Sequence, residues 1–114
     1  MLPENEISRI VIGIAIDVHT VLGAGLLERV YKECLFLKLE KAGLSVEKEK
    51  HIPIIFEEVR LDCGYRIDLV VEKMLFIEIK SVSTLNEVHL AQTINYMKLG
   101  EYKLGLLINF NVVR

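Results

Sequence analysis

The sequence predicts an α/β domain, and three patterns in it support that prediction. Apolar residues recur at spacings of three and four through the first 42 residues, the period then drops to two, and a third helical pattern precedes a last apolar strand. The expected order is α-α-β-β-β-β-α-β, which is typical of a mixed sheet flanked by helices. The 114 residues suffice for one hydrophobic core, so we expect residues 1–114 to form a single domain.

The helices are expected over residues 5–22, 26–42 and 86–99. Asn5 has a side chain suited to capping the first helix. Glycine follows each of the three segments, at Gly23, Gly43 and Gly100, as expected at helix ends.

Strand pieces are expected over residues 46–55, followed by strands over residues 60–72, 74–82 and 103–109. Pro53 and several charges place the first strand segment at an edge of the sheet. Gly64 is expected to bend the second strand, and Lys73 turns the chain so that the second and third strands form a hairpin. The last strand is apolar on both faces, which predicts a central position.

The composition restricts the classes of function. Hydrophobic residues make up 52% of the chain and charged residues 26%, which argues against disorder. No uncharged run reaches the roughly 20 residues that span a bilayer, and the acidic start lacks the apolar stretch of a signal peptide. Cys34 and Cys63 show no metal-binding spacing, so we expect a cytoplasmic protein with reduced, buried thiols. The net charge of −2 supplies no positive field to attract nucleic acid.

Ionisable residues interrupt the predicted hairpin at Asp68, Glu78 and Lys80. Charges in such strands are costly to bury unless they are paired, solvated or bound to metal. Glu78 and Lys80 share one strand face, and Asp68 can meet them across the hairpin. Two carboxylates oriented together suit Mg²⁺ or Mn²⁺, and the backbone carbonyl of Ile79 is a further candidate ligand. Lys80 would then help to deprotonate a water or stabilise charge on a phosphate oxygen.

Simpler explanations of the same residues stay open. Asp68 or Glu78 can form a cross-strand salt bridge with Lys80 or Arg66 on a solvated face, and an aspartate followed by E-x-K is common by chance. Asp62 is an alternative metal ligand, because six residues keep it on the same strand face as Asp68 unless the chain bulges between them.

Two patterns on the predicted helices accompany the acidic residues. Gly25, Glu28 and Tyr31 form a G-x-x-E-x-x-Y signature at the start of the second helix, where Glu28 and Tyr31 share a face. Gln92 and Tyr96 are four residues apart and share a face of the third helix. Each pattern alone is compatible with a structural role, but together with the hairpin residues they follow the order in which a nuclease fold presents its site.

At this point the chain resembles the GxxExxY protein family, in three segments: residues 25–31, 61–69 and 106–111. That family is placed in the PD-(D/E)XK nuclease superfamily, near the RecB-like branch. The resemblance therefore implies a restriction-endonuclease-like core, with a mixed sheet between helices.

The same resemblance implies a role for six residues. It makes Asp68, Glu78 and Lys80 the catalytic trio and Glu28 an additional acid near the metal, while Gln92 and Tyr96 match the helix motif of the RecB-like branch. One departure is Ile67, which stands before Asp68 where the superfamily name has proline.

The leading hypothesis is a nuclease dependent on Mg²⁺ or Mn²⁺ that cleaves DNA, with RNA as the second choice. The alternative is a non-catalytic module that keeps the nuclease fold and acts as an oligomeric or nucleic-acid-binding accessory. A structural interaction protein in which the motif is a coincidence is the third reading. We also expect a homodimer, because the edge segment over residues 46–55 can pair between subunits.

Overall fold

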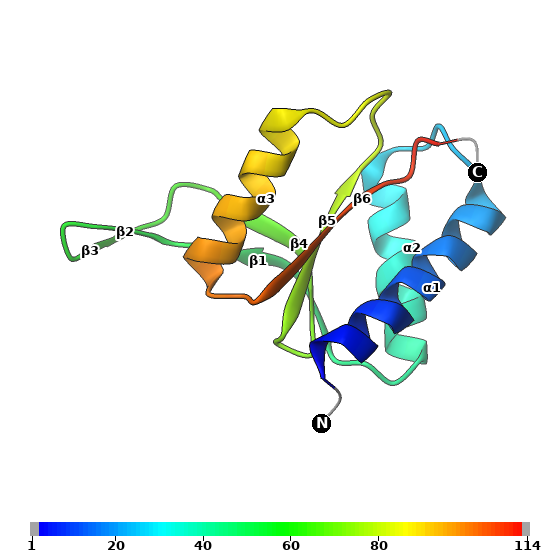
Figure 1. The fold of residues 1–114 in the computed structure, drawn as a ribbon, viewed down its shortest axis with the longest axis horizontal. Helices are drawn as coiled ribbons and strands as arrows, with labels where there is room; N and C mark the ends of the chain where they lie inside the picture. Colours follow the sequence, from blue (N-terminus) through cyan, green and yellow to red (C-terminus); the bar gives the residue numbers. More distant parts are fainter. Residues whose placement is uncertain (1–2, 113–114) are drawn as a thin grey trace.

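In the computed structural model, which describes residues 3–112, three helices flank a four-stranded mixed sheet (Figure 1). The sheet has the order β1-β4-β5-β6, in which only the β5–β6 pair is parallel. This architecture confirms the predicted fold class. The elements in chain order are α1 (Glu4–Leu22), α2 (Glu28–Lys41), β1 (Val46–His51), β2 (Ile54–Phe56), β3 (Val59–Leu61), β4 (Arg66–Val71), β5 (Leu75–Lys80), α3 (Glu87–Gly100) and β6 (Leu104–Asn109).

The helices cover both faces of the sheet, with α1 and α2 on one side and α3 on the other (Figure 1). The larger part of the core joins α1 and α2 to the sheet through fully buried residues such as Val11, Leu35 and Ile77. The smaller part lies under α3 and includes Phe76 and Tyr96. Apolar residues on both faces of β4 and β5 therefore explain why these strands read as nearly continuous hydrophobic runs.

The ends of the helices depend on different capping groups. Asn86 caps α3, because its side chain accepts hydrogen bonds from the backbone N–H groups of Val88 and His89. The expectation that Asn5 caps α1 is wrong. The helix starts one residue earlier, and Pro3 stands at its N-cap with a carbonyl that accepts from the next turn. Proline suits this place because it has no backbone N–H that would need a partner.

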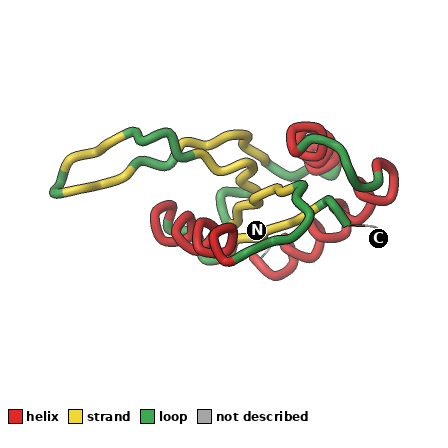
Figure 2. The backbone as a smooth tube through the Cα atoms, turned by 90° about the horizontal axis from the view of Figure 1, so that it is seen from above, coloured by secondary structure: helices red, strands yellow, loops and turns green. Residues whose placement is uncertain are grey.

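The predicted strand over residues 60–72 is in fact two strands, β3 and β4, which belong to different sheets. Gly64 has a φ of 81°, and its N–H donates to the side chain of Asp62, so the chain turns sharply here. As a result β2 and β3 form a two-stranded arm of their own that extends away from the body (Figure 2). The arm adds a fifth strand before α3, one more than the predicted order contains.

The two edges of the main sheet differ in character. The edge position of the first strand is confirmed, since within residues 3–112 β1 pairs with β4 alone, and it carries alternating glutamates and lysines. The central position expected for β6 is wrong, because β6 forms the opposite edge. Its two apolar faces arise from helices on both sides of the sheet, and such coverage does not require a strand on each side.

The β4–β5 hairpin is confirmed. Glu72 and Lys73 both have positive φ angles, 54° and 57°, and the N–H of Met74 closes the turn by donating to Val71. Two left-handed residues in succession match the twist of antiparallel strands.

Cys34 and Cys63 are both free thiols, but the expected burial is wrong for Cys63, whose side chain is exposed, while Cys34 is half-buried. Within residues 3–112, the helices are too short or too polar to cross a membrane.

Candidate functional site

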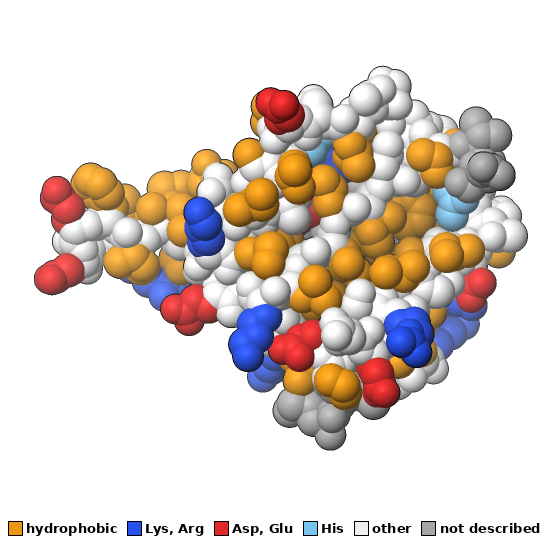
Figure 3. Space-filling view, viewed as in Figure 1, with side chains coloured by type: hydrophobic (Ala, Val, Ile, Leu, Met, Phe, Trp, Pro, Cys, Tyr) orange, Lys and Arg blue, Asp and Glu red, His pale blue; other side chains and the backbone are white. Residues whose placement is uncertain are grey.

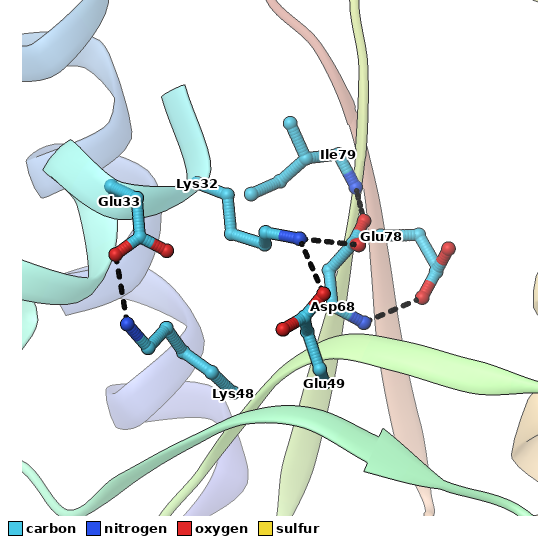
Figure 4. Close-up of polar contacts among 7 residues, drawn as sticks. All are labelled: Lys32, Glu33, Lys48, Glu49, Asp68, Glu78 and Ile79. Atoms are coloured by element: carbon cyan, nitrogen blue, oxygen red, sulfur yellow. Dashed lines mark hydrogen bonds and ion pairs between the residues drawn. The ribbon is translucent and has the colours of Figure 1, made fainter. Parts of the chain in front are cut away.

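The site lies where β4 and β5 separate. The backbone ladder between the two strands runs as far as Leu69 and Ile77, and the next residues along are Asp68 and Glu78. Here the side chains replace the ladder: Oε1 of Glu78 accepts from the N–H of Asp68 at 3.1 Å, and Oδ2 of Asp68 accepts from the N–H of Ile79 at 2.8 Å (Figure 4). Each carboxylate is therefore fixed by the backbone of the neighbouring strand.

Both carboxyl groups are harder to ionise than usual. Burial, followed by repulsion from Asp68, raises the pKa of Glu78 to about 7. Burial also raises the pKa of Asp68, although the hydrogen bond from Ile79 and the charge of Lys32 act against it. Two neighbouring carboxylates that resist ionisation form a place where a cation is favourable.

Lys80 lies half-buried at the end of β5, two residues beyond Glu78. Its charge lowers the pKa of both Asp68 and Glu78, so it acts on the same two groups. No ion pair joins it to either carboxylate among residues 3–112. The simple salt bridge that would explain Lys80 or Arg66 as a structural partner is therefore not formed in this part of the chain.

Glu28 approaches from the first turn of α2. Its Oε2 accepts from the N–H of Ser81 at 3.1 Å, and the hydroxyl of Ser81 donates to the carbonyl of Leu26 at 2.7 Å. Its charge contributes to the raised pKa of both Asp68 and Glu78. The segment that follows β5 thus holds Glu28 near the two carboxylates.

Tyr31 has a structural role in the G-x-x-E-x-x-Y signature. Its hydroxyl donates to the carbonyl of Gly23 and accepts from the N–H of Leu26, while its buried ring stacks on Phe110 at 4.6 Å between centroids. Gly25 has a φ of 94°, a backbone conformation that residues with a side chain rarely adopt. The signature therefore shapes the loop that presents Glu28, and only Glu28 itself faces the site.

The structure adds two residues that the sequence analysis did not include. Lys32, on α2, places its Nζ 3.8 Å from Oδ1 of Asp68 and 3.4 Å from Oε1 of Glu49 (Figure 4). A lysine on a helix and a glutamate in a charged strand carry no signal in the sequence that separates them from their neighbours.

Asp62, the alternative metal ligand, lies outside the site, in the connection before β4. Its exposed side chain accepts a hydrogen bond from the N–H of Gly64 and is 4.0 Å from His51.

A family model described as the PD-(D/E)XK nuclease superfamily matches residues 5–114. The chain belongs to this superfamily. No curated protein and no solved structure shows a significant match to it.

In this PD-(D/E)XK chain, the donor set for a divalent cation is partly assembled. Among residues 3–112, no three acidic, histidine or cysteine side chains come together closely enough to hold a metal ion by themselves. Asp68 and Glu78 are nevertheless brought together, and Mg²⁺ commonly takes one or two carboxylates and keeps several waters. The chemistry of these two oxygen donors therefore fits the metal that the superfamily usually employs.

The predicted helix motif of this PD-(D/E)XK chain lies against the same site. Nε2 of Gln92 donates to the hydroxyl of Tyr96 at 3.2 Å. Burial and the charge of Glu78 both raise the pKa of Tyr96, which places its hydroxyl within the field of the carboxylates. A groove between α3 and the base of the arm continues outward from these residues and includes Tyr65 and Lys98.

His89 and Asn109 have structural roles near the candidate site. Nδ1 of His89 accepts from the N–H of Asn86 and completes the capping box of α3. The side chain of Asn109 holds the backbone of Val82 through both its oxygen and its nitrogen, at 3.1 and 2.9 Å. These contacts fix α3 and the segment after β5, and hence the frame around Glu78.

Proposed function

We propose that this protein is a Mg²⁺- or Mn²⁺-dependent nuclease that hydrolyses phosphodiester bonds in DNA, with RNA as the second choice of substrate. The observation that carries the proposal is the pair of neighbouring carboxylates, half-buried Asp68 and buried Glu78, with raised pKa values at the splayed end of the β4–β5 hairpin. Membership of the PD-(D/E)XK superfamily supports it. The finer placement in the GxxExxY family and the RecB-like branch is part of the same proposal.

The roles of the residues follow from their positions. Asp68 and Glu78 would bind the cation, with the carbonyl of Ile79 and the carboxylate of Glu28 as further oxygen donors. The bound cation would supply Lewis acidity at the phosphate. Lys80 would take a proton from the attacking water or neutralise charge on a phosphate oxygen. Gln92 and Tyr96 would orient the substrate beside Glu78.

Cleavage of labelled DNA and RNA, single- and double-stranded, tests this proposal. We expect cleavage to require Mg²⁺ or Mn²⁺ and to stop when the metal is removed with EDTA. Asp68→Asn and Lys80→Ala should each lower the cleavage rate by at least about a hundredfold, because each removes a group that acts in the transition state.

Asp62→Asn is the matched control for these substitutions. It removes a carboxylate that is close in sequence but lies outside the site, so cleavage should be unchanged. Circular dichroism would establish that every variant is folded. Cleavage that persists in folded Lys80→Ala protein, or that does not depend on a divalent cation, would contradict the proposal.

One observation favours the alternative function, a non-catalytic module that acts as an oligomeric or nucleic-acid-binding accessory. The ammonium of Lys32 rests against Asp68, where it partly neutralises the carboxylate without a metal. If the protein is such a module, the purified protein should bind labelled nucleic acid equally with and without Mn²⁺ and should cleave none of it. With either function, we propose that residues 1–114 form a single domain, that the protein is a homodimer and that it is cytoplasmic.

A further inference from the structure

Lys32 reaches into the site from the second turn of α2. Its side chain is only 15% exposed, and its Nζ lies against Oδ1 of Asp68 while Oδ2 is occupied by the N–H of Ile79 (Figure 4). Oδ1 is thus the oxygen of Asp68 that no backbone donor holds among the described residues. The ammonium donates its hydrogen bond to Glu49, and it lies 3.8 Å from the Asp68 oxygen that a divalent cation would use.

Glu49 binds the same ammonium at 3.4 Å, and its backbone is unusual. It has a φ of 51° in the middle of β1, although glutamate rarely adopts left-handed geometry. Its neighbours Lys48 and Lys50 pair regularly with β4, so Glu49 stands at the position opposite Asp68 and interrupts the ladder there. Backbone strain of this kind costs energy and is found preferentially at functional sites.

The ion pair between Lys48 and Glu33 provides a comparison. It also joins β1 to α2, at 2.8 Å, but the two side chains are 34% and 51% exposed. A solvated pair of this kind contributes little to stability. The Nζ of Lys32 is farther from its partners, at 3.4 and 3.8 Å, but the Lys32 side chain is 15% exposed, against 34% for Lys48. Glu49 is as open to solvent as Glu33, so the ammonium is shielded mainly on the side of Asp68, which is 26% exposed.

We propose that Lys32 occupies the cation position of Asp68 in the metal-free protein, and that a divalent cation has to displace it. Two positive groups on one carboxylate oxygen repel each other, so the ammonium and the cation compete for Oδ1. Glu49 is the second acceptor, which keeps the displaced ammonium beside the site, in reach of a substrate phosphate. This inference rests on the proposed metal-dependent function and assigns two further residues to it.

Calorimetric titration of the whole protein with Mn²⁺ tests the competition, because its readout is binding and not cleavage. Lys32→Met keeps the length of the side chain and removes the competing charge, so the Kd for Mn²⁺ should fall about tenfold, within the usual range for coupled sites. Glu49→Gln leaves Lys32 with Asp68 as its one charged partner, so the Kd should rise. Lys48→Met, the matched control, should leave the Kd unchanged.

The outcomes separate this inference from the function on which it rests. If Mn²⁺ binds and Asp68→Asn abolishes binding, but Lys32→Met binds no more tightly than the natural protein, the competition is wrong and the metal site stands. If neither the natural protein nor Lys32→Met binds Mn²⁺, both ideas fail. Opposite shifts in Kd for the Lys32 and Glu49 variants would support the competition, since loss of folding would weaken binding in both.

Discussion

Glu78 combines deep burial with a neighbouring like charge, and this combination makes its contribution to stability depend on pH. Its pKa in the folded protein is raised to about 7, from an ordinary value of 4.5. Between these two pH values the folded state binds more protons than the unfolded state, so the free energy of unfolding falls as the pH rises. The loss is complete above the folded pKa.

We therefore expect Glu78→Gln to be more stable than the natural protein at pH 8, by at most about 3 kcal/mol. The advantage should shrink as the pH is lowered from 7 to 4.5, because the natural carboxyl then becomes protonated. Urea denaturation at a series of pH values, in EDTA, measures the difference. Glu40→Gln, at an exposed position on α2, is the control. Equal stabilities of the Glu78 variant and the natural protein at pH 8 would show that the ionised Glu78 carboxylate does not destabilise the folded state.

The sequence was sufficient to predict that Asp68 and Glu78 lie together, because charges in apolar strands require an explanation that their neighbours do not. It was insufficient for Lys32 and Glu49. Lys32 is one of several lysines on α2, and only the packing of α2 beside β4 distinguishes it from Lys38 and Lys41. Such contacts between distant segments depend on tertiary structure and leave no local pattern.

At the scale of elements, α3 depends on a strong N-terminal cap. Asn86 satisfies two backbone N–H groups, and α3 carries Gln92 and Tyr96 to the site. Asn86→Ala should lower the free energy of unfolding by about 1 kcal/mol, whereas Asn86→Ser should retain most of it, because serine is also a good N-cap. Chemical denaturation compares the two variants. If alanine and serine destabilise the protein equally, the cap is not what fixes the start of α3.

The predicted elements differ from the observed ones where a short-range sequence pattern is compatible with two different structures. Alternating apolar residues continue from Val59 to Val71, which indicates one strand, yet Gly64 and the carboxylate of Asp62 turn the chain between β3 and β4. The apolar strand β6 was expected at the centre of the sheet, because the sequence shows that both faces are covered but not which strands lie beside it. The hairpin β4–β5, whose turn and register are local, was predicted correctly.

For the whole molecule, the position of β6 changes which surface is suited to self-association. The edge at β1 is charged, whereas β6 lacks charged residues and pairs on one side only within residues 3–112. Figure 3 shows hydrophobic side chains gathered around β6, over α3 and α1, with charged groups mostly toward the border. Ile16 on α1 is 59% exposed and lines a groove with Ile108. An exposed apolar edge of this kind is prone to pair with another strand.

We expect the second strand to be β6 of another copy, antiparallel across a two-fold axis, because such an axis makes one edge complementary to itself. The molecule extends 46 × 35 × 20 Å, and Figure 3 looks down its shortest axis. About half of a face of that size would supply the roughly 800 Å² per partner that a stable dimer buries. The homodimer expected from the sequence would then form at β6 and not at β1.

Light scattering coupled to size-exclusion chromatography decides between these edges. The natural protein should elute as a dimer, and Ile16→Lys should make it monomeric, because the dimer would bury a charge beside β6. Val21→Lys is the matched control, since Val21 is an exposed residue of the same helix that lines a different cleft, with Cys34. A dimer that survives Ile16→Lys but dissociates when charges on β1 are reversed would place the contact at the opposite edge. Asp68 lies on β4 beside β1, and Glu78 lies on β5 beside β6, so a dimer at either edge would bring the partner near one of the two carboxylates.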